Sequence, residues 1–149
     1  MLTTLALVLM VVAAGSLLPF QSGINSMLSR QLGHPLSAAI VNFVVGIAAL
    51  TLGAVVFRAP MQLSTAAART PAWAWLGGLC GATIVVMAML TAPRLGASLV
   101  FGSLIAGQIG GSVVLDHFGW AGYPVHPLSA TRTLGLCALV VGLVLIKKG

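Results

Sequence analysis

Charged residues are scarce in this sequence. Only 5% of its 149 residues are charged, and Asp116 is the one acidic residue beside seven Lys and Arg. A soluble domain carries roughly 25% charged residues to solvate its surface, so a water-exposed globular fold is excluded. The few Cys, His and Asp residues form no catalytic triad and no metal-ligand set, and no phosphate-binding glycine loop is present. We therefore expect no enzyme activity, no metal and no cofactor.

Two other signals are also missing. Cys80 and Cys137 fall inside apolar runs without Cys-x-x-Cys or His spacing, so the sequence predicts neither a disulfide framework nor a metal site. The net charge of +6 comes from basic residues spread singly between apolar runs. Such spacing makes no patch for nucleic acid, and we interpret these residues as topology signals.

Long apolar runs dominate the rest of the chain. Hydrophobic residues make up 59% of it, and its mean hydropathy is +1.12. A membrane-spanning helix needs roughly 20 mostly apolar residues, and five segments meet this requirement. The sequence predicts an all-α, multi-pass protein of the bacterial cytoplasmic membrane, with a single transmembrane domain over residues 1–149. The expected spans are residues 2–31, 36–57, 73–92, 95–115 and 130–147.

Proline, glycine and polar residues mark the breaks between these spans. Residues 33–35 (Gly-His-Pro) should end the first helix, residues 58–71 form a polar connection, and Pro93-Arg94 predicts a tight turn. Residues 116–129 form the last loop. Trp120 and the other aromatic residues beside the connections are typical of headgroup-level anchors.

The first helix changes character half-way along. Pro19 should kink it and free the carbonyl of Gly15, which is tolerated where it faces protein or a water-filled cavity. Gln21 and Asn25 follow one turn apart on the same side. We interpret them as candidate substrate-binding groups.

More neutral polar groups lie inside later spans. The acidic Asp116 follows Gln108 and Ser112 at steps of four on the fourth helix. The neutral groups are Gln108, Ser112 and, in the second helix, Asn42. With Gln21 and Asn25 they could line a cavity that binds a polar solute without a buried counter-charge. The alternative is that they join helices through hydrogen bonds, worth about 0.6–2 kcal/mol each.

Asp116 has two readings as well. It lies near the end of its helix, so it is either a solvated or paired residue at the interface, with His117 or Arg132 as partner, or a functional group. Asp116 and His117 are the one adjacent pair that could handle protons, because a carboxylate favours imidazolium.

Small residues form stripes on the fourth span. Close packing of helices in lipid requires such residues on one face. Packing within one subunit is the default, but the doubled stripe favours a contact between protomers or a moving interface. The stripes are Ser98, Gly102, Ala106 and Gly110, beside Ser103, Gly107 and Gly111.

The loop charges are nearly balanced between the two membrane sides. Arg58, Arg69 and Arg132 fall on the side of the amino terminus, and the other four basic residues fall on the opposite side. Because Lys and Arg asymmetry sets orientation, the chain is expected to insert both ways up. Two copies would then form an antiparallel homodimer. A single orientation with weak bias is the alternative.

Three segments resemble the YdcZ-like proteins of the drug/metabolite transporter superfamily. They are residues 15–25 (GSLLPFQSGIN), 73–81 (WAWLGGLCG) and 106–119 (AGQIGGSVVLDHFG). The resemblance covers nearly the whole chain, and its third segment is the most specific. It implies a five-helix unit equivalent to half of a ten-helix transporter. Small multidrug-resistance relatives carry a glutamate in the first helix, where this chain has Pro19, Gln21 and Asn25, so exchange of protons for cations there is not expected.

Together these patterns predict a secondary transporter of a small metabolite or drug-like solute. It would work by alternating access as a dual-topology homodimer, with itself, lipid and an unidentified solute as its partners. A passive channel and a membrane subunit without transport of its own are the alternatives.

Overall fold

The computed structural model describes residues 2–149, which form helices and connections without strands. Five of these helical segments are long and apolar enough to span a membrane, as the sequence predicts. Two short 3-10 turns, η1 and η2, and one short helix, α3, lie in the connections. The elements are α1 (Leu2–Leu32), α2 (Pro35–Val56), α3 (Leu63–Arg69), η1 (Ala72–Leu76), α4 (Gly77–Leu95), α5 (Ala97–Phe118), η2 (Trp120–Gly122) and α6 (Ala130–Lys148).

The observed bounds differ from the predicted ones at three places. α5 runs to Phe118 rather than to residue 115, so the loop expected over residues 116–129 begins three residues later. α3 folds inside the expected polar connection of residues 58–71, where Ala66 to Ala68 favour a helix. The turn expected at Pro93-Arg94 lies instead at Gly96, whose φ of 79° suits glycine. α4 continues through Pro93 to Leu95, because a proline in the last turn forfeits only one intrahelical hydrogen bond.

The connection between α1 and α2 follows the predicted pattern. Gly33 after α1 has a φ of 75°, which is a common helix-ending conformation of glycine. His34 then caps α2, because its Nδ1 accepts a hydrogen bond from the Leu36 amide at 3.1 Å. Pro35 occupies the first helical position, where its missing amide proton costs nothing.

The described chain divides into two compact units, one ending at Pro93 and the other running from Arg94 to Gly149. Unit 1 contains α1, α2 and most of α4, and unit 2 contains α5 and α6. That the whole chain acts as a single domain stays a prediction.

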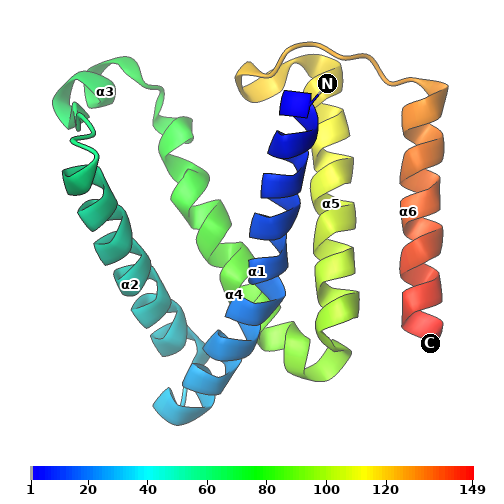
Figure 1. Ribbon diagram of the computed structural model, residues 1–149, viewed down its shortest axis with the longest axis horizontal. Helices are drawn as coiled ribbons and strands as arrows, with labels where there is room; N and C mark the ends of the chain where they lie inside the picture. The colour runs from blue at the N-terminus through cyan, green and yellow to red at the C-terminus, as the bar shows by residue number, and fades with distance from the viewer. Residues whose placement is uncertain (1) are drawn as a thin grey trace. The chain divides into compact units, whose positions relative to one another are not determined.

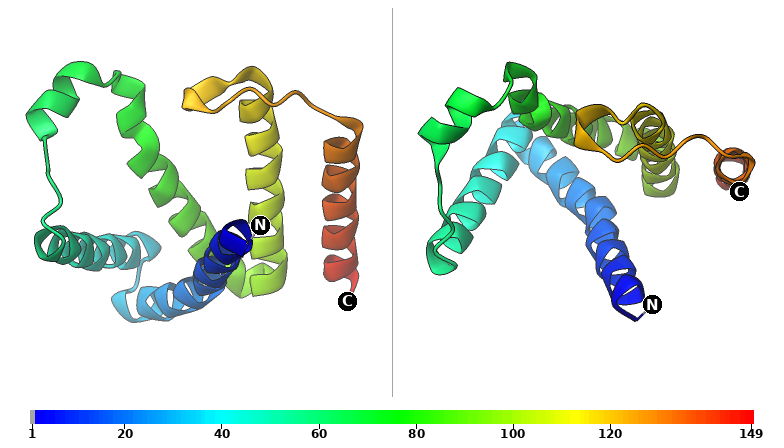
Figure 2. Two further views of the ribbon diagram at one scale, coloured as in Figure 1. Left: turned by 45° about the horizontal axis from the view of Figure 1, so that its top comes forward. Right: turned by 90° about the horizontal axis from the view of Figure 1, so that it is seen from above.

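Unit 1 is held by a small core where its three helices meet. Ala38 and Ala39 of α2 are 0% and 5% exposed, and they pack with Met89 of α4. Alanine side chains let the helix backbones approach closely. α1 and α2 lie together near their connection and diverge from there (Figures 1 and 2). Leu28, Val85 and Val86 complete the core.

Pro93 has a specific consequence inside this core. A proline at this position cannot donate to the carbonyl four residues earlier, which is that of Met89. The Ser26 hydroxyl of α1 donates to this carbonyl at 3.4 Å, in a buried setting. A side chain of one helix therefore satisfies a backbone group that a proline in another helix leaves without its usual donor.

α1 runs unbroken through Pro19, yet its axis changes direction in its middle part (Figure 1). A bend is the usual result of an internal proline, which removes one hydrogen bond and crowds the preceding turn. The lower part of α1 in Figure 1 follows this bend and leads to the connection with α2.

Unit 2 is an antiparallel pair, α5 and α6, joined by the η2 connection (Figure 1). Gly102 of α5 packs against α6 so closely that an added Cβ would lie 2.9 Å from Leu143 Cδ1. Ser129 caps α6, because its Oγ accepts from the Arg132 amide at 3.3 Å. Gly119 ends α5 in the left-handed conformation.

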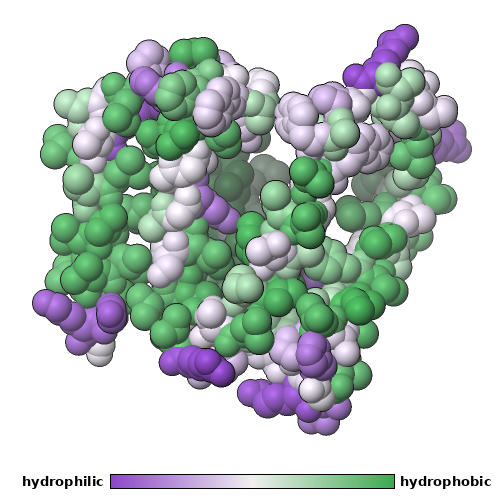
Figure 3. Space-filling model, turned by 180° about the vertical axis from the view of Figure 1, so that it is seen from behind, coloured by the Kyte–Doolittle hydropathy of each residue, from purple (hydrophilic) through white to green (hydrophobic). Residues whose placement is uncertain are grey.

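Most large apolar side chains of the described chain point outward. Leu7, Val11 and Leu50, for example, are 63%, 71% and 75% exposed. Figure 3 shows hydrophobic side chains along the bodies of the helices, while many hydrophilic ones gather at the helix ends. Because water would not solvate such a surface, lipid must cover much of it.

Candidate functional site

The most distinctive polar group of unit 1 joins α1 to α2. Gln21 Nε2 donates to Asn42 Oδ1 at 3.4 Å, and both side chains are partly buried. The long distance makes this a weak hydrogen bond. Gln21 lies two residues after Pro19, and its side chain faces α2.

Three further polar side chains of α1 are buried beside Gln21. Ser22 is 6% exposed, Asn25 is 4% exposed and Ser26 is 9% exposed. Their spacing of three and four residues puts them on one face of α1. We call the five side chains the polar cluster, whose members are Gln21, Ser22, Asn25, Ser26 and Asn42.

One member of the polar cluster is unsatisfied. Within residues 2–149, the buried Ser22 hydroxyl has no hydrogen-bond partner. A buried polar group without a partner costs about 1–3 kcal/mol, and in native proteins such groups often serve a purpose other than stability. All five members are neutral, so the polar cluster offers hydrogen bonds without a charge.

The sequence predicted three of these residues as site candidates, namely Gln21, Asn25 and Asn42. Ser22 and Ser26 were not predicted as site residues. Two signals could have found Ser26: it lies four residues after Ser22, and Pro93 leaves the Met89 carbonyl in need of a donor.

The candidates on α5 lie apart from the polar cluster in the sequence and belong to unit 2. Gln108 and Ser112 are exposed on the surface of α5, and the Ser112 hydroxyl donates to the Gln108 carbonyl of its own helix at 2.8 Å. That they line a solute cavity together with Gln21 and Asn25 stays a prediction.

Asp116 forms an ion pair between α5 and α6. Arg132 Nη1 lies 3.2 Å from Asp116 Oδ2, and the two side chains are 36% and 25% exposed. The same Nη1 donates to the His126 carbonyl at 3.3 Å. Arg132 is one of the two partners predicted for Asp116 from the sequence.

His117 is engaged elsewhere. Its Nδ1 accepts a hydrogen bond from the Leu128 amide at 3.1 Å, and the His126 amide donates to the Asp116 carbonyl at 2.7 Å. These bonds fasten the connection after η2 to the end of α5. In the described part of the chain, neither bond joins the His117 ring to the Asp116 carboxylate. The role of Asp116 and His117 as a proton-handling pair stays a prediction.

The small residues of α5 have different surroundings. Gly102 contacts Leu143 within the chain, whereas Gly107, Gly110 and Gly111 have open space where a Cβ would lie. Ser98 and Gly107 are exposed, and Ala106 is half-buried. One position of the stripe therefore packs inside unit 2, and a contact with another protomer stays a prediction for the rest.

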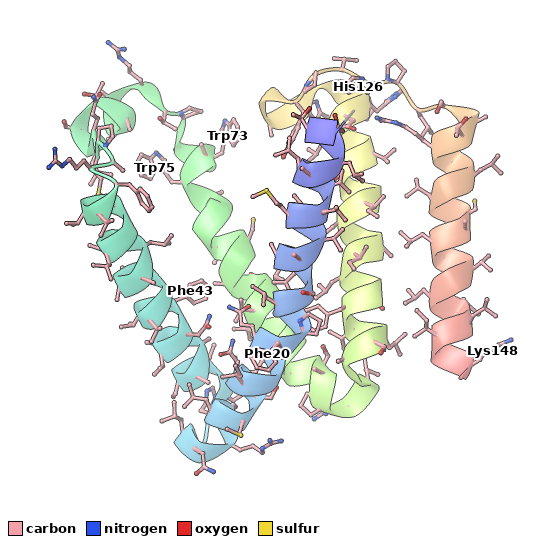
Figure 4. All side chains as sticks on the ribbon, in the orientation of Figure 1. Phe20, Phe43, Trp73, Trp75, His126 and Lys148 are labelled. Carbon is pink, nitrogen blue, oxygen red and sulfur yellow. The ribbon has the colours of Figure 1, made fainter. Side chains whose placement is uncertain are left out.

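Aromatic side chains lie at the ends of the spans. Figure 4 shows Trp73 and Trp75 at the start of the third span, where both are more than half exposed. In unit 2, Trp120 stacks on Phe118 with ring centres 4.9 Å apart. These positions suit rings that anchor helices at headgroup level.

Comparison with known proteins agrees with this architecture. Residues 6–145 match the sequence model of a family described as "Putative inner membrane exporter, YdcZ". No curated protein and no solved structure matches the chain significantly. The match spans nearly all of the chain and includes all three segments that carry the resemblance. With five apolar helices, it identifies a multi-pass inner membrane protein of transporter type. The chain therefore belongs to the YdcZ family.

Proposed function

We propose that the protein is a secondary transporter that binds a small, uncharged or anionic solute at the polar cluster of unit 1. The unpaired Ser22 hydroxyl is the observation on which this rests. A solute that accepts or donates one hydrogen bond there would replace a cost with a favourable contact. The exporter description of the family supports transport in general.

The neutral character of the polar cluster supports this choice of solute class. Unit 1 carries its basic side chains, Arg30, Arg58 and Arg69, near helix ends or in a connection, and none of its described residues is acidic. An organic cation would find no counter-charge in the cluster, and leaving water without one is costly. Amide and hydroxyl groups instead suit a polar neutral solute, and an anionic group would need their hydrogen-bond donors to offset the same desolvation cost.

We further propose that two oppositely inserted copies complete the transporter. The balance of loop charges, three basic residues against four, supports dual topology. The doubled small-residue stripe of α5 supports close contact with a second copy. Alternating access would then follow from rocking of the two copies, with the bend of α1 at Pro19 as one deformable point.

The solute site is tested with Ser22→Ala and the matched control Ser16→Ala. Ser16 lies on the same helix, is exposed and donates to its own Ala13 carbonyl. Removing an unsatisfied hydroxyl should raise the free energy of unfolding by about 1 kcal/mol. The same change should reduce the thermal shift produced by a bound solute. That solute is found by screening metabolites, and cationic drugs in the same screen should give no shift.

A higher free energy of unfolding together with a smaller solute-induced thermal shift would support the site, because a residue with only a structural role would not show both. Loss of stability on Ser22→Ala, with the solute shift unchanged, would overturn it. Ser16→Ala should change neither quantity.

Two alternative functions, a passive channel and a subunit without transport, give different results in planar bilayers and in liposomes. A passive channel would produce unitary currents in planar bilayers, whereas a transporter gives solute flux without them. A subunit without transport of its own would give no flux for any solute that shifts the melting temperature.

Cysteine labelling at both termini tests dual topology: protection of one terminus in every molecule would exclude it.

Proton coupling through Asp116 and His117 is a separate part of this proposal. If the Asp116 carboxylate carries the coupled proton, Asp116→Asn should abolish accumulation driven by a pH gradient while leaving downhill flux measurable. Equal accumulation by the variant and the parent would exclude this role.

A further inference from the structure

A groove runs between α5 and α6 in unit 2. It has a volume of about 460 Å³, within the range of roughly 300–1,000 Å³ found for ligand sites. A second cavity of about 220 Å³ continues along the same helix pair and shares Leu139 with the first. The first is lined by Ile109, Ser112, Val113, Asp116, Arg132, Gly135, Leu136 and Leu139.

The groove is polar at one end and apolar along the rest. Asp116 lies in the last turn of α5 and Arg132 in the first turn of α6, so the ion pair lies at the loop end. Ile109 and Leu139 lie about two helical turns farther along, and the second cavity is lined by Gly, Ala, Leu and Ile only. A membrane lipid is polar and apolar in the same order, because its headgroup lies at the interface and its acyl chains extend toward the bilayer centre.

The ion pair leaves hydrogen-bonding capacity on both partners. Arg132 uses a single nitrogen, Nη1, for Asp116 Oδ2 and the His126 carbonyl. Within residues 2–149, its Nη2 and Nε and the second Asp116 oxygen have no protein partner. A planar guanidinium edge with free N–H groups suits a phosphate, and a free carboxylate oxygen suits an ammonium group.

We propose that this groove binds an aminophospholipid of the phosphatidylethanolamine type. Its phosphate would accept from the free edge of Arg132, its ammonium would donate to Asp116, and one acyl chain would lie between α5 and α6. A lipid with a phosphate but no amine would leave the Asp116 carboxylate facing a second negative charge. The groove should therefore prefer the zwitterionic lipid to phosphatidylglycerol.

Native mass spectrometry of the purified full chain tests this, with phosphatidylethanolamine and phosphatidylglycerol offered in equal amounts. The parent should retain the first lipid at least about fivefold better. Asp116→Asn should remove that preference, and Arg132→Gln should weaken binding of both lipids about tenfold, as expected when charge-assisted hydrogen bonds are lost. Equal retention by the parent would overturn the headgroup assignment.

A groove-filling variant avoids the ion pair. Gly135 lines the groove and has open space where a Cβ would lie, so Gly135→Leu should fill it without a clash. The control is Gly46→Leu on α2. A Cβ at Gly46 also meets nothing within 4 Å, and Gly46 does not line the groove. Gly135→Leu should reduce retention of phosphatidylethanolamine, and Gly46→Leu should not.

Equal retention by the two glycine variants would overturn the acyl-chain assignment. So would efficient disulfide cross-linking of Gly135→Cys between two copies, on a background of Cys80→Ser and Cys137→Ser, because a second copy would then fill the groove. Neither result depends on solute transport.

Discussion

The two units hold their polar groups in opposite ways. In unit 1 the polar cluster consists of neutral side chains within the spans, three of which are buried, with Asn25 only 4% exposed. In unit 2 the strongest polar contact is the Asp116–Arg132 ion pair, which is partly exposed at the loop end. Burying a neutral group needs only hydrogen bonds, whereas burying a charge in lipid is far more costly. The difference supports our proposal that unit 1 recognises the solute and unit 2 contributes anchoring at the interface.

The largest expected effect tests this division directly. Asn25→Ala should reduce solute flux in liposomes by at least about tenfold, the cost of roughly 1.4 kcal/mol in binding. It should leave the proposed dimer intact in size-exclusion chromatography. Asp116→Asn should reduce downhill flux less. The reverse order would show that unit 2 carries the solute site.

Gln108→Ala sharpens the same comparison. Gln108 is an exposed side chain of α5 in the single chain. Loss of flux equal to that of Asn25→Ala would show that the working cavity includes unit 2. Parent-level flux from both variants would show that the polar cluster is not the site.

Packing of unit 2 gives the next effect. Gly102→Leu would force atoms against Leu143, where even a Cβ lies 2.9 Å from Cδ1. Overpacking costs about 1–3 kcal/mol, so the free energy of unfolding in mixed detergent should fall by this amount. Adding Leu143→Ala should recover part of the loss. No rescue would mean that Gly102 is needed at a contact with another protomer instead.

The sequence predicted the five spans and the break between the first two helices because each depends on a local property. Twenty apolar residues span a bilayer, and Gly33 with Pro35 ends one helix and starts the next. Gln21 and Asn42 were both identified as polar groups within spans, but their hydrogen bond depends on how α1 and α2 pack. That packing is a property of tertiary structure, so the pairing could not be read from spacing.

The end of α4 near Pro93 also could not be predicted from local sequence. The sequence alone suggested a turn at Pro93, since proline usually ends helices. The structure continues α4 past it, where the Ser26 hydroxyl donates to the Met89 carbonyl. The compensating donor lies 63 residues away in the sequence, which no local pattern reveals.

This compensation predicts a moderate and non-additive effect. Ser26→Ala should lower the free energy of unfolding by about 1 kcal/mol, because a buried carbonyl loses its donor. In a Pro93→Ala background the backbone amide restored by that substitution supplies the donor, so Ser26→Ala should cost almost nothing. A double-mutant cycle in mixed detergent measures the coupling. Additive effects would mean that Ser26 does not replace the missing proline amide.

The smallest expected effect concerns the Gln21–Asn42 contact. At 3.4 Å its hydrogen bond is long, and interhelical hydrogen bonds in membranes average about 0.6 kcal/mol in double-mutant cycles. A cycle of Gln21→Leu and Asn42→Leu should therefore give a coupling of about 0.6 kcal/mol or less in stability. A bound solute should change that coupling if both amides turn toward it, because each amide would then exchange its partner for the solute. A coupling well above about 1 kcal/mol that no solute alters would mean that the pair holds α1 to α2, and the neutral groups of unit 1 would then be a structural link rather than a binding site.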